Sequence, residues 1–228
     1  TEMLAFKEAE KFLVVTGSKV FTQYIPNYYT DHVSSNVSSN VSSNVSSNAS
    51  SSVNNTIQSN EHQSSPQKLS SHPLSNIQLD MGVRLPLAKR SDYKNNLYGQ
   101  NPYTSYIVKF PVKNSEGKLH ITLVAIARSQ DVNVVYLTLT SEQLIKQSFK
   151  FLGERYGWGH DYNGRDCTGF VDEVYKSFGF IMPRNSGQQA KGDYGQNHFF
   201  NEKATTAEKL AVIATLQVGD LIYIPGHV

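Results

Sequence analysis

The sequence of 228 residues has little of several features that define whole classes of protein. It contains one cysteine, Cys167, so an internal disulfide framework is excluded. No stretch approaches the roughly 18 consecutive apolar residues of a membrane-spanning helix. The net charge is only +2 and no longer run of lysine or arginine occurs, which argues against nucleic acid as the main partner, because phosphate binding needs a concentrated basic surface.

Hydrophobic residues make up 39% of the chain and charged residues 18%, so a globular core can form while part of the chain is unusually polar. The polar part begins at Val33, where the unit Val-Ser-Ser-Asn repeats four times, and serine and asparagine dominate to about Ser65. Such a segment cannot bury enough apolar surface to offset its ordering entropy. We therefore predict a disordered insertion at about residues 33–72.

The chain before residue 140 shows the period-two alternation and the polar turns of short strands. The predicted strands are Phe12–Val15, Val20–Tyr24, Ile77–Leu87, Tyr103–Val112, Leu119–Ala127 and Val132–Leu139. The turn at residues 114–117 predicts that the two strands on either side of it form a hairpin. Several short strands with polar turns indicate a small β-barrel.

Helical signals dominate after residue 140. Thr140 or Ser141 can cap a helix that runs to about Leu152. The apolar side chains expected to form its buried face are Leu144, Ile145, Phe149 and Leu152. A further helix is predicted at residues 207–216, followed by a strand at Leu221–Ile224.

The single cysteine lies where a loop becomes a helix. Glycines and an asparagine mark the loop, and apolar residues at helical spacing follow: Phe170, Val171, Val174, Tyr175 and Phe178. Gly179 is placed to end this helix. The unpaired N–H groups and the dipole of a helix N-terminus stabilise a thiolate, so Cys167 is predicted to be a nucleophile rather than a packing residue.

Three motifs around Cys167 resemble the core of the NlpC family of cell-wall cysteine peptidases. They are Tyr-Gly-Trp-Gly from Tyr156, Gly-Arg-Asp-Cys-Thr-Gly-Phe-Val around the cysteine, and Pro-Arg-Asn-Ser-x-x-Gln from Pro183. The family usually has serine after the cysteine, and Thr168 keeps that hydroxyl. The resemblance runs from about residue 141 to the end of the chain, and it implies a papain-like arrangement.

The expected fold class is therefore α+β, with two domains. Residues 141–228 resemble an NlpC-type peptidase domain, whose C-terminal part is expected to be missing. Residues 1–140 resemble the bacterial SH3-like β-barrel that precedes some of these peptidases, particularly in LDMGVRLPL and TSYIVKFPV. The predicted disordered insertion would interrupt this barrel.

The resemblance also implies a general base. In the family the histidine follows a Gly-Asp-Leu strand, and GDLIYIPGHV supplies it here as His227. His160 is expected to neighbour the cleft, and His198 to be solvated. A third polar residue, which orients the imidazole, is expected beyond Val228. The implied reaction uses a thiol and an imidazole, so we expect no metal and no cofactor.

Family members typically cut the bond between D-glutamate and a diamino acid, diaminopimelate or lysine, in peptidoglycan stem peptides. The resemblance implies that Tyr156 donates to the oxyanion beside Cys167 and that His227 transfers protons. The residues expected to bind substrate are Asp166, Arg165, Thr168, Trp158, Ser186 and Arg184. Asp166 can instead cap the helix, and Trp158 can be a wall of the cleft rather than a stacking partner.

Two other functions stay open at this point. The chain could be a catalytically impaired protein that binds cell wall or muropeptides, or an amidase or acyltransferase that uses the same thiol. In each case the expected partners are peptidoglycan stem peptides or muropeptides. The expected location is the cell envelope, periplasmic or secreted; a signal peptide could already have been removed.

Overall fold

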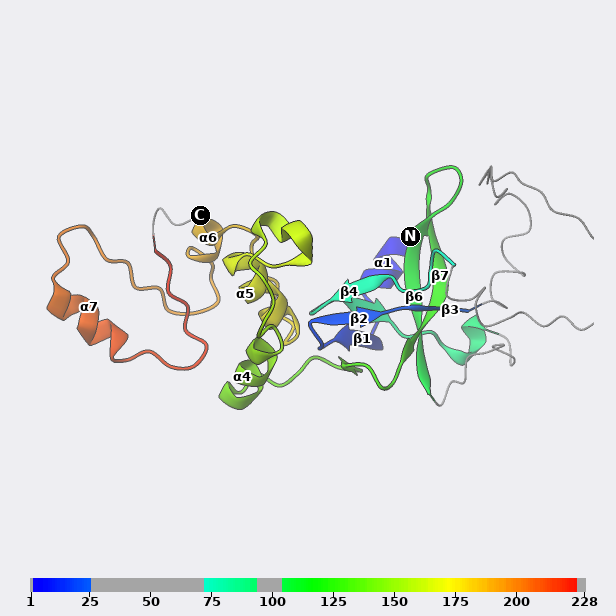
Figure 1. Ribbon diagram of the computed structural model, residues 1–228, viewed down its shortest axis with the longest axis horizontal. Coiled ribbons are helices and arrows are strands. Elements are labelled where there is room, and N and C mark those ends of the chain that lie inside the picture. The colour runs from blue at the N-terminus through cyan, green and yellow to red at the C-terminus, as the bar shows by residue number, and fades with distance from the viewer. Residues whose placement is uncertain (1, 26–71, 94–103, 225–228) are drawn as a thin grey trace, which may run out of the picture.

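The computed structural model describes residues 2–25, 72–93 and 104–224. Strands dominate before residue 134 and helices after residue 140, so the fold mixes helices and sheets as expected (Figure 1). The predicted insertion at about residues 33–72 lies outside the described residues, apart from His72. In chain order the elements are α1 (Glu2–Lys7), β1 (Phe12–Val15), β2 (Lys19–Phe21), β3 (Gln23–Tyr24), β4 (Gln78–Asp80), β5 (Arg84–Pro86), η1 (Arg90–Asp92), β6 (Ser105–Lys113), β7 (Leu119–Ala127), β8 (Val132–Asn133), α4 (Ser141–Phe149), η2 (Trp158–Asn163), α5 (Cys167–Lys176), α6 (Ser186–Gln189) and α7 (Thr206–Ile213).

The strands form three antiparallel sheets, in the orders β5-β1-β8, β2-β4 and β3-β7-β6. The predicted hairpin is confirmed: β6 pairs with β7 from Ser105 opposite Ala127 to Lys113 opposite Leu119. Across residues 2–25, 72–93 and 104–224 no closed barrel is found. The expected barrel is therefore not confirmed, and the likeness to an SH3-like domain stays a prediction.

The alternation of side chains along β7 sends its residues into two separate apolar clusters. Val124 and Ile126 join the main cluster of the sheets, with Leu13, Val15, Val20, Leu79 and others. Leu123 and Ala125 face the opposite side, where they pack with Ile25 and Ile107. All four β7 residues are buried, so both faces of this strand contribute to the core.

The predicted strand at residues 132–139 is mostly wrong. Only Val132 and Asn133 pair with another strand, β1. Beyond them the chain turns toward α5, where the N–H of Leu137 donates to the carbonyl of Ser177 at 3.0 Å. Val135, in this non-strand stretch, is 57% exposed.

Helix α4 begins as predicted, since the Thr140 hydroxyl accepts a hydrogen bond from the N–H of Gln143 at 3.2 Å. Its predicted buried face is largely wrong. Leu144 is buried, but Ile145, Phe149 and Leu152 are all exposed. Gln147 is buried instead and donates to the Ser177 hydroxyl at 3.3 Å, because α4 packs on α5 along a narrow stripe.

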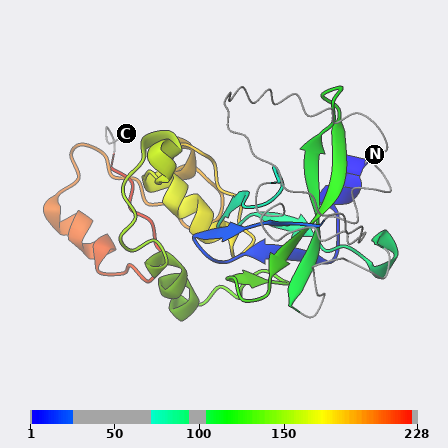
Figure 2. The ribbon, with the colours of Figure 1, turned by 45° about the vertical axis from the view of Figure 1, so that its right-hand side comes forward.

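Helix α5 lies between the strands and the C-terminal segment (Figures 1 and 2). The turn after β4 packs directly against it. Met81 enters the cluster formed by Leu144, Phe151, Val174 and Phe178. Gly82 has φ +83°, and a Cβ there would lie 2.2 Å from the Cβ of Lys176, so only glycine permits this close approach.

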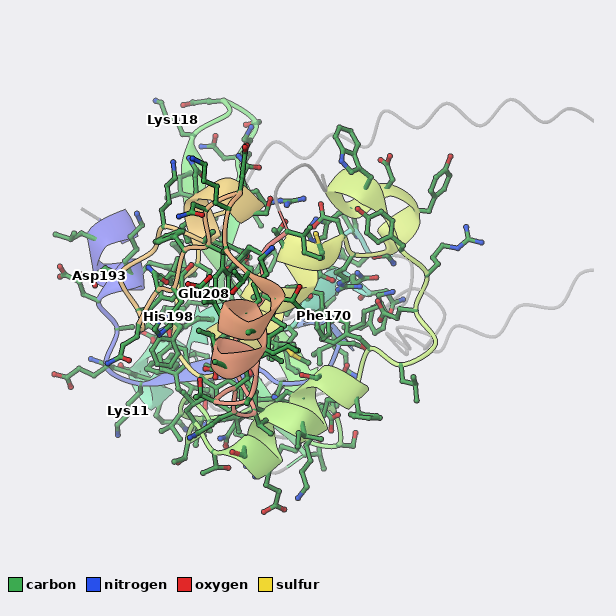
Figure 3. The ribbon with its side chains drawn as sticks, turned by 90° about the vertical axis from the view of Figure 1, so that its left-hand side faces the viewer. Lys11, Lys118, Phe170, Asp193, His198 and Glu208 are labelled. Carbon is green, nitrogen blue, oxygen red and sulfur yellow. The ribbon has the colours of Figure 1, made fainter. Side chains whose placement is uncertain are left out.

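The segment after α6 extends away from the rest of the molecule and carries α7. Figure 3 looks from this end, with Glu208 of α7 in front of Phe170 of α5. None of residues 191–224 is buried. The predicted strand at Leu221–Ile224 is wrong: these residues have no regular secondary structure and pair with no strand in the described part of the chain. No helix within the described ranges is long and apolar enough to cross a membrane.

Candidate active site

Cys167 is the first residue of α5 and its side chain is exposed. The helix starts here because Asp166 adopts an extended conformation and caps it, with a side-chain oxygen accepting from the N–H of Gly169 at 2.7 Å. Gly179, with φ +91°, ends the helix region as predicted. The sequence thus places the only thiol of the chain at the solvent-facing start of a helix.

Asp166 is the centre of a polar cluster beside Cys167. Its carboxylate also accepts from the N–H of Gly159 at 3.1 Å and forms an ion pair with Arg184. Burial raises the pKa of Asp166, but the hydrogen bonds from Arg184, Gly169 and Gly159 outweigh burial and lower the pKa to about 2. The carboxyl is therefore ionised at neutral pH, and its charge is balanced by Arg184.

Thr168 and Arg184 complete this cluster. The Thr168 hydroxyl donates to Asp166 at 3.2 Å and accepts from Arg184 at 2.8 Å. Arg184 remains 45% exposed, so its guanidinium faces both the cluster and solvent. Three predicted substrate-binding residues are thus in mutual contact next to the predicted nucleophile.

Gln189 was not predicted as a site residue, although it closes the third sequence motif. It is buried, and its amide nitrogen donates to the carbonyls of Thr168 at 3.2 Å and Pro183 at 2.8 Å. These bonds tie α6 and the Arg184 loop to the first turn of α5. Its place at the end of the third motif could have indicated that Gln189 belongs to the site. The spacing of residues along the sequence could not show that its side chain is buried.

The loop before α5, at residues 156–163, presents aromatic side chains to solvent and is called the aromatic loop below. Tyr156 and Trp158 are 59% and 65% exposed. The backbone of Tyr156 forms a bridge with Arg165, and the N–H of Gly157 donates to the carbonyl of Arg165 at 3.0 Å. This pairing holds the aromatic loop alongside the residues that immediately precede Cys167.

Arg165, predicted to touch substrate, is instead enclosed, with 4% of its side chain exposed. Its guanidinium lies among three carboxylates, at 3.0 Å from Glu173, 2.8 Å from Glu154 and 2.8 Å from Asp80. Burial alone would lower the pKa of Arg165, but these carboxylates outweigh burial and raise the pKa. This placement favours a structural role over direct substrate contact.

His160 lies over the first turn of α5. A Cβ on Gly169 would be 3.1 Å from the Cε1 atom of His160, so a larger residue there would have to displace the ring by a few tenths of an ångström. The Nε2 atom of His160 is 3.0 Å from the buried carboxylate of Glu173. Burial raises the pKa of Glu173, although His160 and Arg165 act against this shift.

Ser186 begins α6 and lines a cavity of about 1330 Å³ between α4, α5 and the segment after α6. Cys167 is exposed and is not among the residues that line this cavity. The predicted base, His227, lies outside the described residues. His198 is exposed in the segment after α6, as expected. No group of three or more histidine, cysteine or acidic side chains suited to a metal occurs in the described ranges.

These features define a class of site: an accessible thiol at a helix start, flanked by an ionised aspartate and an arginine. Such a site suits attack of a thiolate on a carbonyl group. Residues 153–228 match the model of the NlpC/P60 family. The chain therefore carries an NlpC/P60 family domain at residues 153–228.

Two curated proteins with the same name are similar to parts of this chain. The gamma-D-glutamyl-L-lysine dipeptidyl-peptidase of Bacillus subtilis is 40% identical over 57 residues, covering 25% of this chain and 19% of that protein. Its counterpart in Bacillus cereus is 37% identical over 87 residues, covering 38% of this chain and 22% of that protein. The chain thus spans about a fifth of the length of the curated relatives that it matches.

Two solved structures are also similar. An NlpC/P60 endopeptidase from Photobacterium damselae subsp. piscicida aligns with a TM-score of 0.47 and 18% identity, covering 83% of this chain and 28% of that chain. An NlpC/P60 family protein from Bacillus cereus aligns with a TM-score of 0.43 and 21% identity, covering 82% of this chain and 42% of that chain.

Proposed function

We propose that the protein is a cysteine peptidase that cleaves the bond between γ-D-glutamate and the following diamino acid in peptidoglycan stem peptides. The observation that carries this proposal is the exposed Cys167 at the first residue of α5, within the NlpC/P60 domain. The names of the two curated relatives support a γ-D-glutamyl substrate with L-lysine as the diamino acid. From this substrate we infer a location in the cell envelope or outside the cell.

In the proposed reaction His227 takes the proton of the Cys167 thiol, and the thiolate attacks the γ-carbonyl carbon of the D-glutamyl residue. The C=O π electrons move to oxygen, and donors near the helix start, with Tyr156 among them, stabilise that oxyanion. Collapse breaks the C–N bond, and the imidazolium of His227 protonates the leaving amine. Water then hydrolyses the thioester, which restores the thiol and releases the γ-D-glutamyl product.

The polar cluster supplies charges for recognising the substrate. Arg184 is half exposed beside the nucleophile, so it is available for a substrate carboxylate. Asp166 is ionised and lies one residue before Cys167, where it can attract a substrate ammonium group. Thr168 and Ser186 add hydroxyl groups, and Trp158 forms an apolar wall. Arg165 acts through its neighbours rather than by contact.

The proposal is tested by digesting L-Ala-γ-D-Glu-L-Lys and its diaminopimelate analogue and analysing the products by mass spectrometry. We expect the protein to release L-Ala-γ-D-Glu, and Cys167→Ala to release none while keeping its circular dichroism spectrum. Undiminished product from Cys167→Ala would reject the nucleophile. Binding of the peptides without cleavage by the unaltered protein would favour a cell-wall binding protein instead.

A further inference from the structure

The loop before α5 has an unusual backbone. Four of the five residues 159–163 adopt positive φ: Gly159 at 62°, His160 at 71°, Tyr162 at 54° and Asn163 at 58°. Three of them are not glycine, and such residues lose free energy in this conformation unless the surroundings hold them. The loop therefore needs external support to keep its shape, and it carries Trp158, the only tryptophan of the chain.

One set of supports comes from α5 itself. The N–H of Gly159 donates to Asp166, and the His160 ring binds Glu173, as described above. These contacts fix the middle of the loop to the helix whose first residue is Cys167. They do not fix the far end of the loop, at Tyr162 and Asn163.

The far end is held by β4. The side-chain amides of Asn163 and Gln78 exchange two hydrogen bonds, each of 2.8 Å. Lys19, on the neighbouring strand β2, adds a bond from its Nζ atom to the carbonyl of Asn163 at 3.2 Å. The support therefore comes from residues far away in the sequence: Gln78 is 85 positions and Lys19 is 144 positions from Asn163.

Asp80 extends the same contact to Arg165. Its Oδ1 atom accepts from the Gln78 amide at 2.7 Å and from the Arg165 guanidinium at 2.8 Å. Arg165 in turn holds Glu173, which holds His160. A continuous chain of hydrogen bonds thus runs from Asn163 through β4 and back to the middle of the same loop.

The side chains of β4 alternate between a polar face and a buried face, so this strand can support the aromatic loop. Gln78 and Asp80 are two residues apart and share one face, whereas Leu79 between them is buried in the main sheet cluster. Pairing with β2 fixes the strand's backbone, with Lys19 opposite Asp80 and Phe21 opposite Gln78. The polar face of β4 is therefore a rigid support for the loop.

We propose that Gln78 and Asp80 are positioning residues for the candidate active site: they hold the aromatic loop and Arg165 in place beside Cys167. Neither residue is expected to touch substrate. The effect on catalysis rests on the proposed peptidase function, but the effect on the loop does not. Because β4 belongs to the strand-rich part of the chain, the sheets take part in forming the site.

The test compares Asp80→Ala and Gln78→Ala with the unaltered protein. Steady-state anisotropy of Trp158 reports the loop directly, because no other tryptophan interferes. We expect both variants to lower the anisotropy and, with L-Ala-γ-D-Glu-L-Lys, to lower kcat/KM about tenfold, mainly through kcat, since displacing groups by about 1 Å can reduce rates up to about a hundredfold. Asp80→Glu, which keeps the carboxylate, is expected to restore part of both readouts.

Asp92→Asn is the matched control. Asp92 is also a partly buried aspartate in an ion pair, 3.0 Å from Lys109, but it lies on η1 away from the loop. It should change neither readout. If an alanine variant does not fold, as judged by circular dichroism, Asp80→Asn replaces it in the same comparison.

The outcomes separate the two proposals. Unchanged anisotropy and kcat/KM in folded Asp80 and Gln78 variants would overturn the positioning role and leave the peptidase function standing. A fall in anisotropy in a protein that cuts no γ-D-glutamyl peptide would support the positioning role and reject the peptidase function. Equal losses in Asp92→Asn would also overturn the positioning role, because the effect would then be general.

Discussion

The surroundings of Cys167 and the last described segment of the chain are built in opposite ways. Around residues 154–189, buried charges lie within a network of partners, and no buried side-chain nitrogen or oxygen of the described residues lacks a hydrogen bond. In residues 191–224, no residue is buried, and Phe199, Ile222 and Ile224 are 72%, 68% and 64% exposed. The nucleophile thus lies within a dense network of contacts, whereas the residues leading to His227 are largely exposed and are held by few bonds, such as the one from the Tyr223 hydroxyl to the Gln189 side chain at 3.3 Å.

This difference indicates where the free energy of folding resides. The sheets bury a large aliphatic core, and the charged network joins them to α5 through Arg165 and Asp80. The segment that carries α7 adds few packed contacts, so changes in it should be tolerated.

Arg165→Met should destabilise the protein most. The change leaves the buried carboxylate of Glu173, and those of Glu154 and Asp80, without their shared cation. Breaking a buried ion pair from one side typically destabilises by about 3–5 kcal/mol. The free energy of unfolding can be measured by denaturant titration at pH 7.

The control for this variant is Arg128→Met. Arg128 is exposed and stacks on Tyr106 in the strand-rich part, with 4.1 Å between its guanidinium carbon and the ring centre. Its loss should lower the free energy of unfolding by less than about 1 kcal/mol. Equal losses of unfolding free energy in the two variants would show that the network around Arg165 stabilises the fold no more than an exposed arginine does.

A pair of isoleucine truncations tests the packing difference. Ile126 on β7 is fully buried, whereas Ile213 on α7 is 50% exposed. Ile126→Ala should destabilise by about 2–5 kcal/mol through lost burial and a cavity. Ile213→Ala should change stability by less than about 0.5 kcal/mol. A large loss for Ile213→Ala in the same titration would mean that α7 packs against another surface.

Asp166→Asn should have a smaller, pH-dependent effect. Because the folded-state pKa is lowered to about 2, the charge of Asp166 stabilises the fold above the ordinary carboxyl pKa near 4, and this contribution is lost as the pH falls toward 2. Asparagine keeps a capping oxygen, so the change isolates the charge. The variant should be less stable by about 2 kcal/mol at pH 7.

The pH dependence is checked by unfolding both proteins at pH 7, 4 and about 2.5, values that pass through the ordinary carboxyl pKa and approach the lowered one. The difference in the free energy of unfolding between the two proteins should be largest at pH 7 and should become smaller as the pH approaches 2. A difference that stays constant over this range would contradict the ion pair with Arg184 as the source of the low pKa.

Much of the local structure was predictable from the sequence. The β6–β7 hairpin followed from alternation around a polar turn, and the start of α5 followed from the change of period after Cys167. The Asp166 cap was one of two roles considered for that residue. These features depend on neighbours within a few residues, which is the range that periodicity and capping rules describe.

The long-range contacts were not predictable in the same way. The burial of Arg165 depends on Asp80, which is 85 positions away, and no local pattern indicates that pair. The buried face of α4 was misjudged because Ile145 and Phe149 have helical spacing, but no neighbour in the described part of the chain covers them. The Leu221–Ile224 segment has the composition of a strand, but a strand needs a partner and finds none among the described residues.

The nucleophilic role of Cys167 can be tested by trapping the covalent intermediate during turnover. The protein is mixed with L-Ala-γ-D-Glu-L-Lys, quenched with acid within milliseconds to seconds, and digested for mass spectrometry. If Cys167 is the nucleophile, the fragment containing Cys167 gains the mass of an L-Ala-γ-D-glutamyl acyl group, and this adduct is absent from Cys167→Ala. Release of L-Ala-γ-D-Glu by Cys167→Ala at an unaltered rate, with no acyl group on that fragment in either protein, would show that Cys167 is not the nucleophile.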